Sequence, residues 1–178
     1  MSKKKIGRKA ITQPVKHNIA KITEPIKAAK VHFDFSDNRW LCSVRKGEYT
    51  NFLKDAEQCL KTHYNLFYTI IPKVLDEWDR IKTGFGTRQY PHCHKIEGKQ
   101  RELVLEVYKE LYNYELGEEV SLYQLSFTGA NRLIVIYGAA KETIKPIFID
   151  HHHQIYPSIK HNQKDLSSYN YCIVCSHK

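Results

Sequence analysis

The last third of the chain carries the pattern that most constrains its fold: three β-prone runs separated by short turns. The runs are Val120–Phe127, Arg132–Tyr137 and Thr143–Asp150. Thr128–Asn131 and Gly138–Glu142 supply the turns. A connection this short can join two antiparallel strands, whereas a parallel pair needs a crossover of about a dozen residues or more. The sequence therefore predicts a three-stranded antiparallel meander.

Earlier in the chain, apolar residues recur every three or four positions, which is helical spacing. This spacing occurs over Tyr49–Leu60, Leu66–Ile81 and Gln100–Tyr112. Proline lacks a backbone N–H and clashes with the preceding turn, so Pro72 should start a new helix or kink the second one. We expect two or three helices before the meander.

Two further β-prone segments precede the helices. Val31–Phe35 and Trp40–Val44 flank the turn-forming pair Asp37-Asn38, which predicts a β-hairpin. Helices and strands that are segregated along the chain indicate an α+β fold and not an alternating α/β fold. We therefore predict one α+β domain over residues 31–178, in which an antiparallel sheet packs against the helices with the hairpin at its edge.

The positive charge is concentrated at the N-terminus. The chain has a formal net charge of +9, and residues 1–30 contribute nine basic side chains against the single acid Glu24. Such an arm contacts phosphates without reading sequence. The candidate nucleic-acid contacts in it are Lys3, Lys4, Lys5, Arg8 and Lys9. The alternative is a solvated tail that keeps the protein soluble.

The predicted location is the cytoplasm. No apolar run approaches the ~20 residues that a membrane-spanning helix needs. No apolar block follows the basic N-terminus, so a secretory signal is not expected. The five cysteines, an odd number, favour reduced thiols. No cofactor is expected, because the phosphate-binding glycine-rich loops and nucleophile elbows are missing from the sequence.

The densest polar cluster follows the third run, at Asp150–His153. Neighbouring residues of a strand point to opposite sides, so His151 and His153 should share one side, with Asp150 orienting an imidazole. Imidazoles beside a cation suit metal-free RNA cleavage, which needs a base, an acid and a group that stabilises the phosphoryl charge. The candidate catalytic residues are His151, His152, His153, Tyr156, Arg132 and Lys160. The alternative is a polar loop that caps the sheet.

A second cluster, Tyr90-Pro-His-Cys-His94, lies in a predicted loop. Tyr90, His92 and His94 are candidate nucleic-acid contacts, because an aromatic ring can stack on a base. His92 and His94 could instead bind zinc together with Cys172 and Cys175. If Cys172 and Cys175 lie on a strand, they point in opposite directions and are buried thiols.

The order and the residue pattern of the predicted strands resemble those of the sheet in RelE/ParE-like toxins, including HigB-type members. The similar segments are Leu122–Tyr137 and Ile144–Pro157, within a resemblance that covers roughly residues 97–160. In that family helices precede an antiparallel sheet, and basic, His and Tyr residues near its C-terminal strands cut ribosome-bound mRNA. The resemblance implies an antitoxin partner and a phosphate-contacting role for Arg132. It also implies acid, base and stacking roles for His151 to His153, Tyr156 and Lys160.

Three functions therefore remain open from the sequence. The first is a metal-independent endoribonuclease of the toxin kind. The second is a non-catalytic nucleic-acid-binding module of phage or defence origin, which uses the basic arm. The third is a zinc-stabilised interaction protein.

Overall fold

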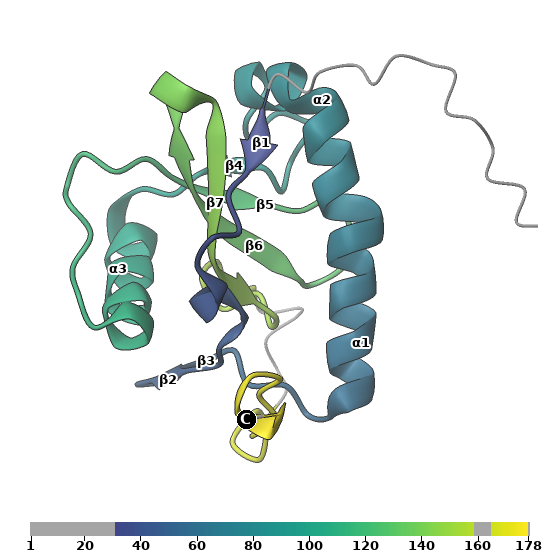
Figure 1. The fold of residues 1–178 in the computed structure, drawn as a ribbon, viewed down its shortest axis with the longest axis vertical. Coiled ribbons are helices and arrows are strands. Elements are labelled where there is room, and N and C mark those ends of the chain that lie inside the picture. Colours follow the sequence, from purple (N-terminus) through teal and green to yellow (C-terminus); the bar gives the residue numbers. More distant parts are fainter. Residues whose placement is uncertain (1–30, 159–164, 178) are drawn as a thin grey trace, which may run out of the picture.

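The computed structural model describes residues 31–158 and 165–177 of the chain. Its centre is a five-stranded mixed sheet in the order β1-β7-β6-β5-β4, accompanied by a two-stranded sheet of β2 and β3 (Figure 1). The strands are β1 (His32–Phe33), β2 (Arg45–Lys46), β3 (Tyr49–Thr50), β4 (His94–Lys95), β5 (Leu122–Leu125), β6 (Arg132–Gly138) and β7 (Thr143–Asp150). The α-helices are α1 (Ala56–Asn65), α2 (Ile71–Thr83) and α3 (Gly98–Tyr112).

The predicted meander is confirmed. β5 pairs with β6 and β6 pairs with β7, both antiparallel, and the second pairing places Arg132 opposite Asp150. The register shifts between Ile134 and Val135, where Ile147 of β7 is an extra residue without a partner position in β6. The antiparallel strands therefore put the start of β6 and the end of β7 at one edge of the sheet.

The side chains of β6 alternate between two hydrophobic clusters, one on each face of the sheet. Leu133 and Val135 belong to the cluster that includes Trp78 of α2. Ile134 belongs to the cluster that includes Val107 of α3. Figure 1 shows α1 and α2, which follow each other as one helical rod, along one side of the sheet and α3 on the other. This arrangement confirms an α+β fold in which the sheet packs against helices.

The helical rod of α1 and α2 begins later than its apolar spacing predicts. The Asp55 side chain accepts the Gln58 N–H (2.8 Å) and caps α1, and the Gln58 side chain accepts the Lys54 N–H (2.8 Å). The prediction of a helix from Tyr49 is therefore wrong, because Tyr49 lies in β3, upstream of this cap. Reciprocal capping of this kind fixes the first turn of a helix.

Pro72 has the effect that its missing N–H predicts. A π-helical segment, Leu66–Ile70, follows α1, and α2 then begins with Pro72 in its first turn. The prediction of a new helix or a kink at this proline is confirmed.

The predicted N-terminal hairpin is wrong. β1 pairs in parallel with β7, so that His32 lies opposite Thr143, and Asn38–Leu41 forms a 3₁₀ helix. The cause is local: the Asp37 carboxylate accepts the Arg39 N–H (3.0 Å), which caps a helical turn where a hairpin needs a two-residue β-turn. Trp40 on this turn is buried in the core.

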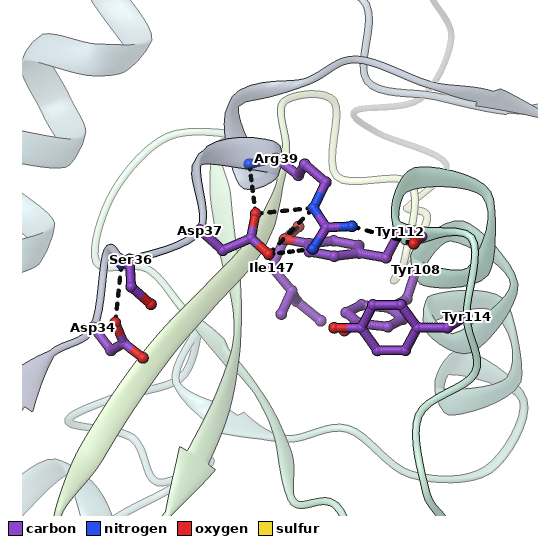
Figure 2. Close-up of polar contacts among 8 residues, drawn as sticks. All are labelled: Asp34, Ser36, Asp37, Arg39, Tyr108, Tyr112, Tyr114 and Ile147. Atoms are coloured by element: carbon purple, nitrogen blue, oxygen red, sulfur yellow. Dashed lines mark hydrogen bonds and ion pairs between the residues drawn. The ribbon is translucent and has the colours of Figure 1, made fainter.

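A set of polar contacts fastens this segment to α3 (Figure 2). The Arg39 guanidinium pairs with Asp37, lies 4.4 Å from the centroid of the Tyr112 ring and donates to the Tyr112 carbonyl (3.2 Å). The Tyr112 hydroxyl in turn donates to the Ile147 carbonyl of β7 (3.0 Å). These contacts hold the end of α3 against the sheet.

Within the described ranges, none of the helices has the length and apolar character that crossing a membrane would require.

Candidate functional site

A cavity of about 550 Å³ lies where β6 begins and β7 ends. Three segments distant in the sequence contribute to it: the loop before β4, the turn between β5 and β6, and the chain that follows β7. Its lining residues are His92, Gly129, Ala130, Arg132, His153 and Ser158. We refer to this cavity as the Arg132 pocket.

Arg132 is the buried cation of the pocket, with 3% of its surface exposed. Its Nη1 donates to the Gly129 carbonyl (2.7 Å), the Ser126 hydroxyl (3.1 Å) and the Asn131 carbonyl (3.1 Å). Its Nε has no hydrogen-bond partner in the described part of the chain. Burial lowers the pKa of Arg132, and the nearby Asp150 charge partly offsets this effect. A guanidinium that lines a cavity is suited to binding an anion, because it carries a fixed positive charge and several hydrogen-bond donors.

The side chain of Asp150 organises the turn that follows β7. Its carboxylate accepts the backbone N–H groups of His152 (3.2 Å) and Ile155 (2.9 Å). The chain then passes through a left-handed conformation at His153, where φ is +58°. Burial raises the pKa of Asp150, and these backbone hydrogen bonds act in the opposite direction. Asp150 therefore shapes the turn that carries His153 into the lining of the pocket.

His92 brings a second imidazole to the pocket. Burial lowers the pKa of His92, and the nearby Arg132 and His94 lower it further. Arg132, His92 and His94 can each carry a positive charge, and they lie close enough for these charges to repel one another. A bound anion would offset this repulsion, because an opposite charge favours the protonated form of a histidine.

His94 lies next to this group on β4 and is held by its neighbours. The Gln124 side-chain amide lies 3.0 Å from His94 Nε2, and the Tyr156 ring meets the imidazole edge-on at 4.6 Å between centroids. Gln124 Oε1 is buried without a partner among the described residues. Tyr156 is half-buried and packs against the hydrophobic cluster that includes Val107, so it is not among the lining residues of the pocket.

The expectation that His151 and His153 share one side is wrong. His151 is buried, with 7% of its surface exposed, and burial lowers its pKa to about 3. His152 instead contacts the Phe52 carbonyl through Nε2 (2.7 Å) and packs against Tyr169. The alternation of a strand does not apply to these histidines, because β7 ends at Asp150 and a turn follows.

Tyr90 does not serve as a base-stacking residue. It is buried, and its hydroxyl donates to the Glu77 carboxylate (2.7 Å), so that the ring belongs to the core beside α2. Lys160 and the arm residues lie outside the described residues. Those arm residues are Lys3, Lys4, Lys5, Arg8 and Lys9.

The proposed zinc ligands do not come together. Among residues 31–158 and 165–177, no group of three or more His, Cys, Asp or Glu side chains could hold a metal ion. His92 belongs to the Arg132 pocket, whereas Cys172 lies beside Ser43, whose N–H donates to its sulfur (3.4 Å). The zinc site built from His92, His94, Cys172 and Cys175 is therefore wrong.

Sequence reasoning grouped Arg132 with His153 in one candidate site but assigned His92 to a separate cluster, and it missed Gly129, Ala130 and Ser158. A usable signal was the glycine in the turn before β6. Gly129 adopts a φ of +72° and presents its carbonyl to Arg132, so this turn positions the guanidinium.

The comparisons with known proteins locate the chain among relatives. A family model described as "Uncharacterised protein UU032" matches residues 36–178. A protein of Ureaplasma parvum with the same description is 30% identical over 178 residues, which cover 97% of this chain and 94% of the relative. No solved structure matches the chain.

Proposed function

The chain belongs to the UU032 family, and we propose that it is a metal-independent endoribonuclease that holds the scissile phosphate of RNA in the Arg132 pocket. The observation that carries the proposal is the lining of one cavity by a buried arginine and two histidines, Arg132, His92 and His153. A base, an acid and a fixed cation are what the attack of a 2′-hydroxyl on its neighbouring phosphate requires.

The roles follow from the state of each group. The lowered pKa of His92 keeps this imidazole neutral near pH 7, so it accepts the proton of the 2′-hydroxyl. The 2′-oxygen then attacks phosphorus, and Arg132 stabilises the charge on the non-bridging oxygens. His153, the second imidazole that lines the pocket, donates a proton to the departing 5′-oxygen. The products are a 2′,3′-cyclic phosphate and a 5′-hydroxyl.

The resemblance to RelE/ParE-like toxins supports the same activity. In both, helices precede a set of antiparallel strands, here β5 to β7, and Arg132 begins one of these strands. On the basis of this resemblance, the proposed location is the cytoplasm, the proposed substrate is ribosome-bound mRNA and the proposed protein partner is an antitoxin. The pair His92 and His153 takes the place of the sequence-derived pair His151 and His153.

The test is cleavage of a structureless RNA by the purified chain in excess EDTA. We expect cleavage by the wild type and a loss of about 100-fold or more for His153→Ala, since general acid–base catalysis contributes about 10²–10⁴-fold. His177→Ala is the matched control, because His177 is exposed on the C-terminal turn and far along the chain from the pocket. Equal rates for both variants would remove His153 from the reaction.

A second candidate is favoured by one observation, the net charge of +8 on residues 1–30. In this case the chain binds RNA or DNA through phosphate contacts and does not cleave it. Binding that persists in the wild type without any cleavage product would favour this function over the nuclease.

A further inference from the structure

Cys172 and Cys175, a pair of cysteines near the C-terminus, are not among the lining residues of the Arg132 pocket. The chain turns directly after Cys172: the Ser176 N–H donates to the Cys172 carbonyl (2.9 Å), and the Cys175 N–H donates to Cys172 Sγ (3.4 Å). The two cysteines thus belong to one tight turn and not to a strand, so the condition under which they would point in opposite directions is not met. The Cys175 side chain is also a hydrogen-bond partner of the Cys172 sulfur, so the two thiols lie next to each other.

The two thiols differ in accessibility. Cys175 is exposed, whereas Cys172 is 1% exposed. Burial acts to raise the pKa of Cys172, but the contacts with Cys175 and with the Ser43 N–H outweigh it and leave the pKa below its ordinary value. The buried sulfur is therefore the readier thiolate of the pair, and the exposed sulfur is the one that a reagent can reach.

We propose that Cys172 and Cys175 are a dithiol–disulfide pair that exchanges reversibly with low-molecular-weight disulfides. The Cys175 thiolate attacks one sulfur of the small disulfide, whose S–S bond breaks, and one small thiol leaves with a proton. The Cys172 thiolate then attacks the Cys175 sulfur of this mixed disulfide, and the second small thiol leaves. The chain loses two electrons and two protons, and the small disulfide becomes two thiols.

The remaining cysteines are poor competitors for this reaction. Cys93 is fully buried, and burial raises its pKa to about 11. Cys59 is also buried, with its pKa raised by burial. Cys42 is half-buried. Since thiolate character and exposure together control cysteine reactivity, oxidation should be selective for the Cys172–Cys175 turn.

The experiment equilibrates the full-length chain with excess oxidised glutathione, quenches it with acid, and counts alkylated thiols in the denatured protein by mass. The reduced chain should take up five alkyl groups, one for each cysteine. The oxidised chain should take up two fewer, and peptide mapping should join Cys172 to Cys175. Reduced glutathione in excess should restore the missing two.

Three variants separate the roles. Cys172→Ser should retain a glutathione adduct on Cys175, because no second sulfur displaces it. Cys175→Ser should form neither a disulfide nor an adduct on Cys172. Cys42→Ser, the matched control, should form the same disulfide as the wild type. The proposal is overturned if the wild type keeps all its thiols after oxidation, or if Cys172 pairs with Cys59 or Cys42. It is also overturned if folded Cys172→Ser carries no glutathione adduct. If a variant does not fold, the thiol count and peptide map of the wild type still decide.

Discussion

Arg132 and Asp150 are register partners across the β6–β7 pair, yet each directs its polar atoms elsewhere. The Asp150 carboxylate accepts backbone N–H groups of the following turn, and Arg132 Nη1 donates to the turn before β6. The guanidinium is thus held in place without a carboxylate occupying all of its donors. This separation leaves a buried positive charge beside the cavity.

Replacing this charge should weaken RNA binding. We expect Arg132→Gln to lower the affinity for a non-cleavable RNA, with 2′-deoxy sugars, by about tenfold to a hundredfold, since hydrogen bonds to charged groups contribute about 1.5–3 kcal/mol. Fluorescence anisotropy at fixed salt measures the change. Arg80→Gln is the matched control, because Arg80 is exposed on α2. An equal loss in both variants would mean that charge in general, and not the pocket, binds the RNA.

RNA binding should depend on pH through His92. In the free protein, burial and the neighbouring Arg132 and His94 lower its pKa. A bound phosphate favours the protonated imidazole and raises this pKa, so the complex takes up a proton and the affinity rises as the pH falls. Anisotropy titrations between pH 5 and 8 should show this rise in the wild type and a smaller one in His92→Gln. The same slope in both would show that His92 does not meet the phosphate.

His151 should make the fold sensitive to acid. Its pKa is about 3 in the folded chain against an ordinary value of 6.5, so the folded state keeps this imidazole neutral while the unfolded state protonates it. The stability is present above pH 6.5 and is lost as the pH falls toward 3, by up to about 1.4 kcal/mol per pH unit.

Urea unfolding between pH 7 and 4 tests this dependence. His151→Gln has no charge to gain, so its free energy of unfolding should fall less steeply with pH than that of the wild type. His177→Gln, at an exposed position, should keep the wild-type slope. Parallel curves for the wild type and His151→Gln would contradict the burial of a neutral His151.

The basic arm makes a separate contribution to binding. Deleting residues 1–30 removes a net charge of +8 and little apolar sequence. We expect weaker binding to RNA and DNA and a shallower dependence of affinity on salt, because fewer counterions are released. Binding at several salt concentrations measures this, and circular dichroism should show an unchanged fold. A truncated chain that does not fold would make the arm a structural element.

The strands β5 to β7 could be predicted because their apolar runs are bounded by short turns, which leave one antiparallel arrangement. β1 could not, since its two residues pair with β7, more than a hundred positions later, and no local pattern encodes that partner. The start of α1 was misplaced because apolar spacing continues upstream through Tyr49, whereas the capping of α1 by Asp55 and Gln58 sets the boundary.

The sequence indicated several residues of the candidate site, but it did not indicate how they are arranged. Arg132 and His153 were identified, but period-two alternation was carried past the end of β7, which wrongly grouped His151 with His153. The side chain of Asp150 causes this difference, because it draws the backbone of the following residues into a turn. His92 was predicted as a nucleic-acid contact in a separate cluster, and only the pairing of β4 with β5 brings its segment to the same end of the sheet.

The most direct test of the proposed nuclease uses a DNA strand that contains a single ribonucleotide, incubated with the chain in excess EDTA. The 2′-hydroxyl of that residue is the only group on the strand that can attack a neighbouring phosphate as the proposed mechanism requires. We predict one cut, directly 3′ of the ribonucleotide, with a 2′,3′-cyclic phosphate on one product and a 5′-hydroxyl on the other. An intact strand, cuts at deoxyribonucleotides or a 5′-phosphate product would contradict the account.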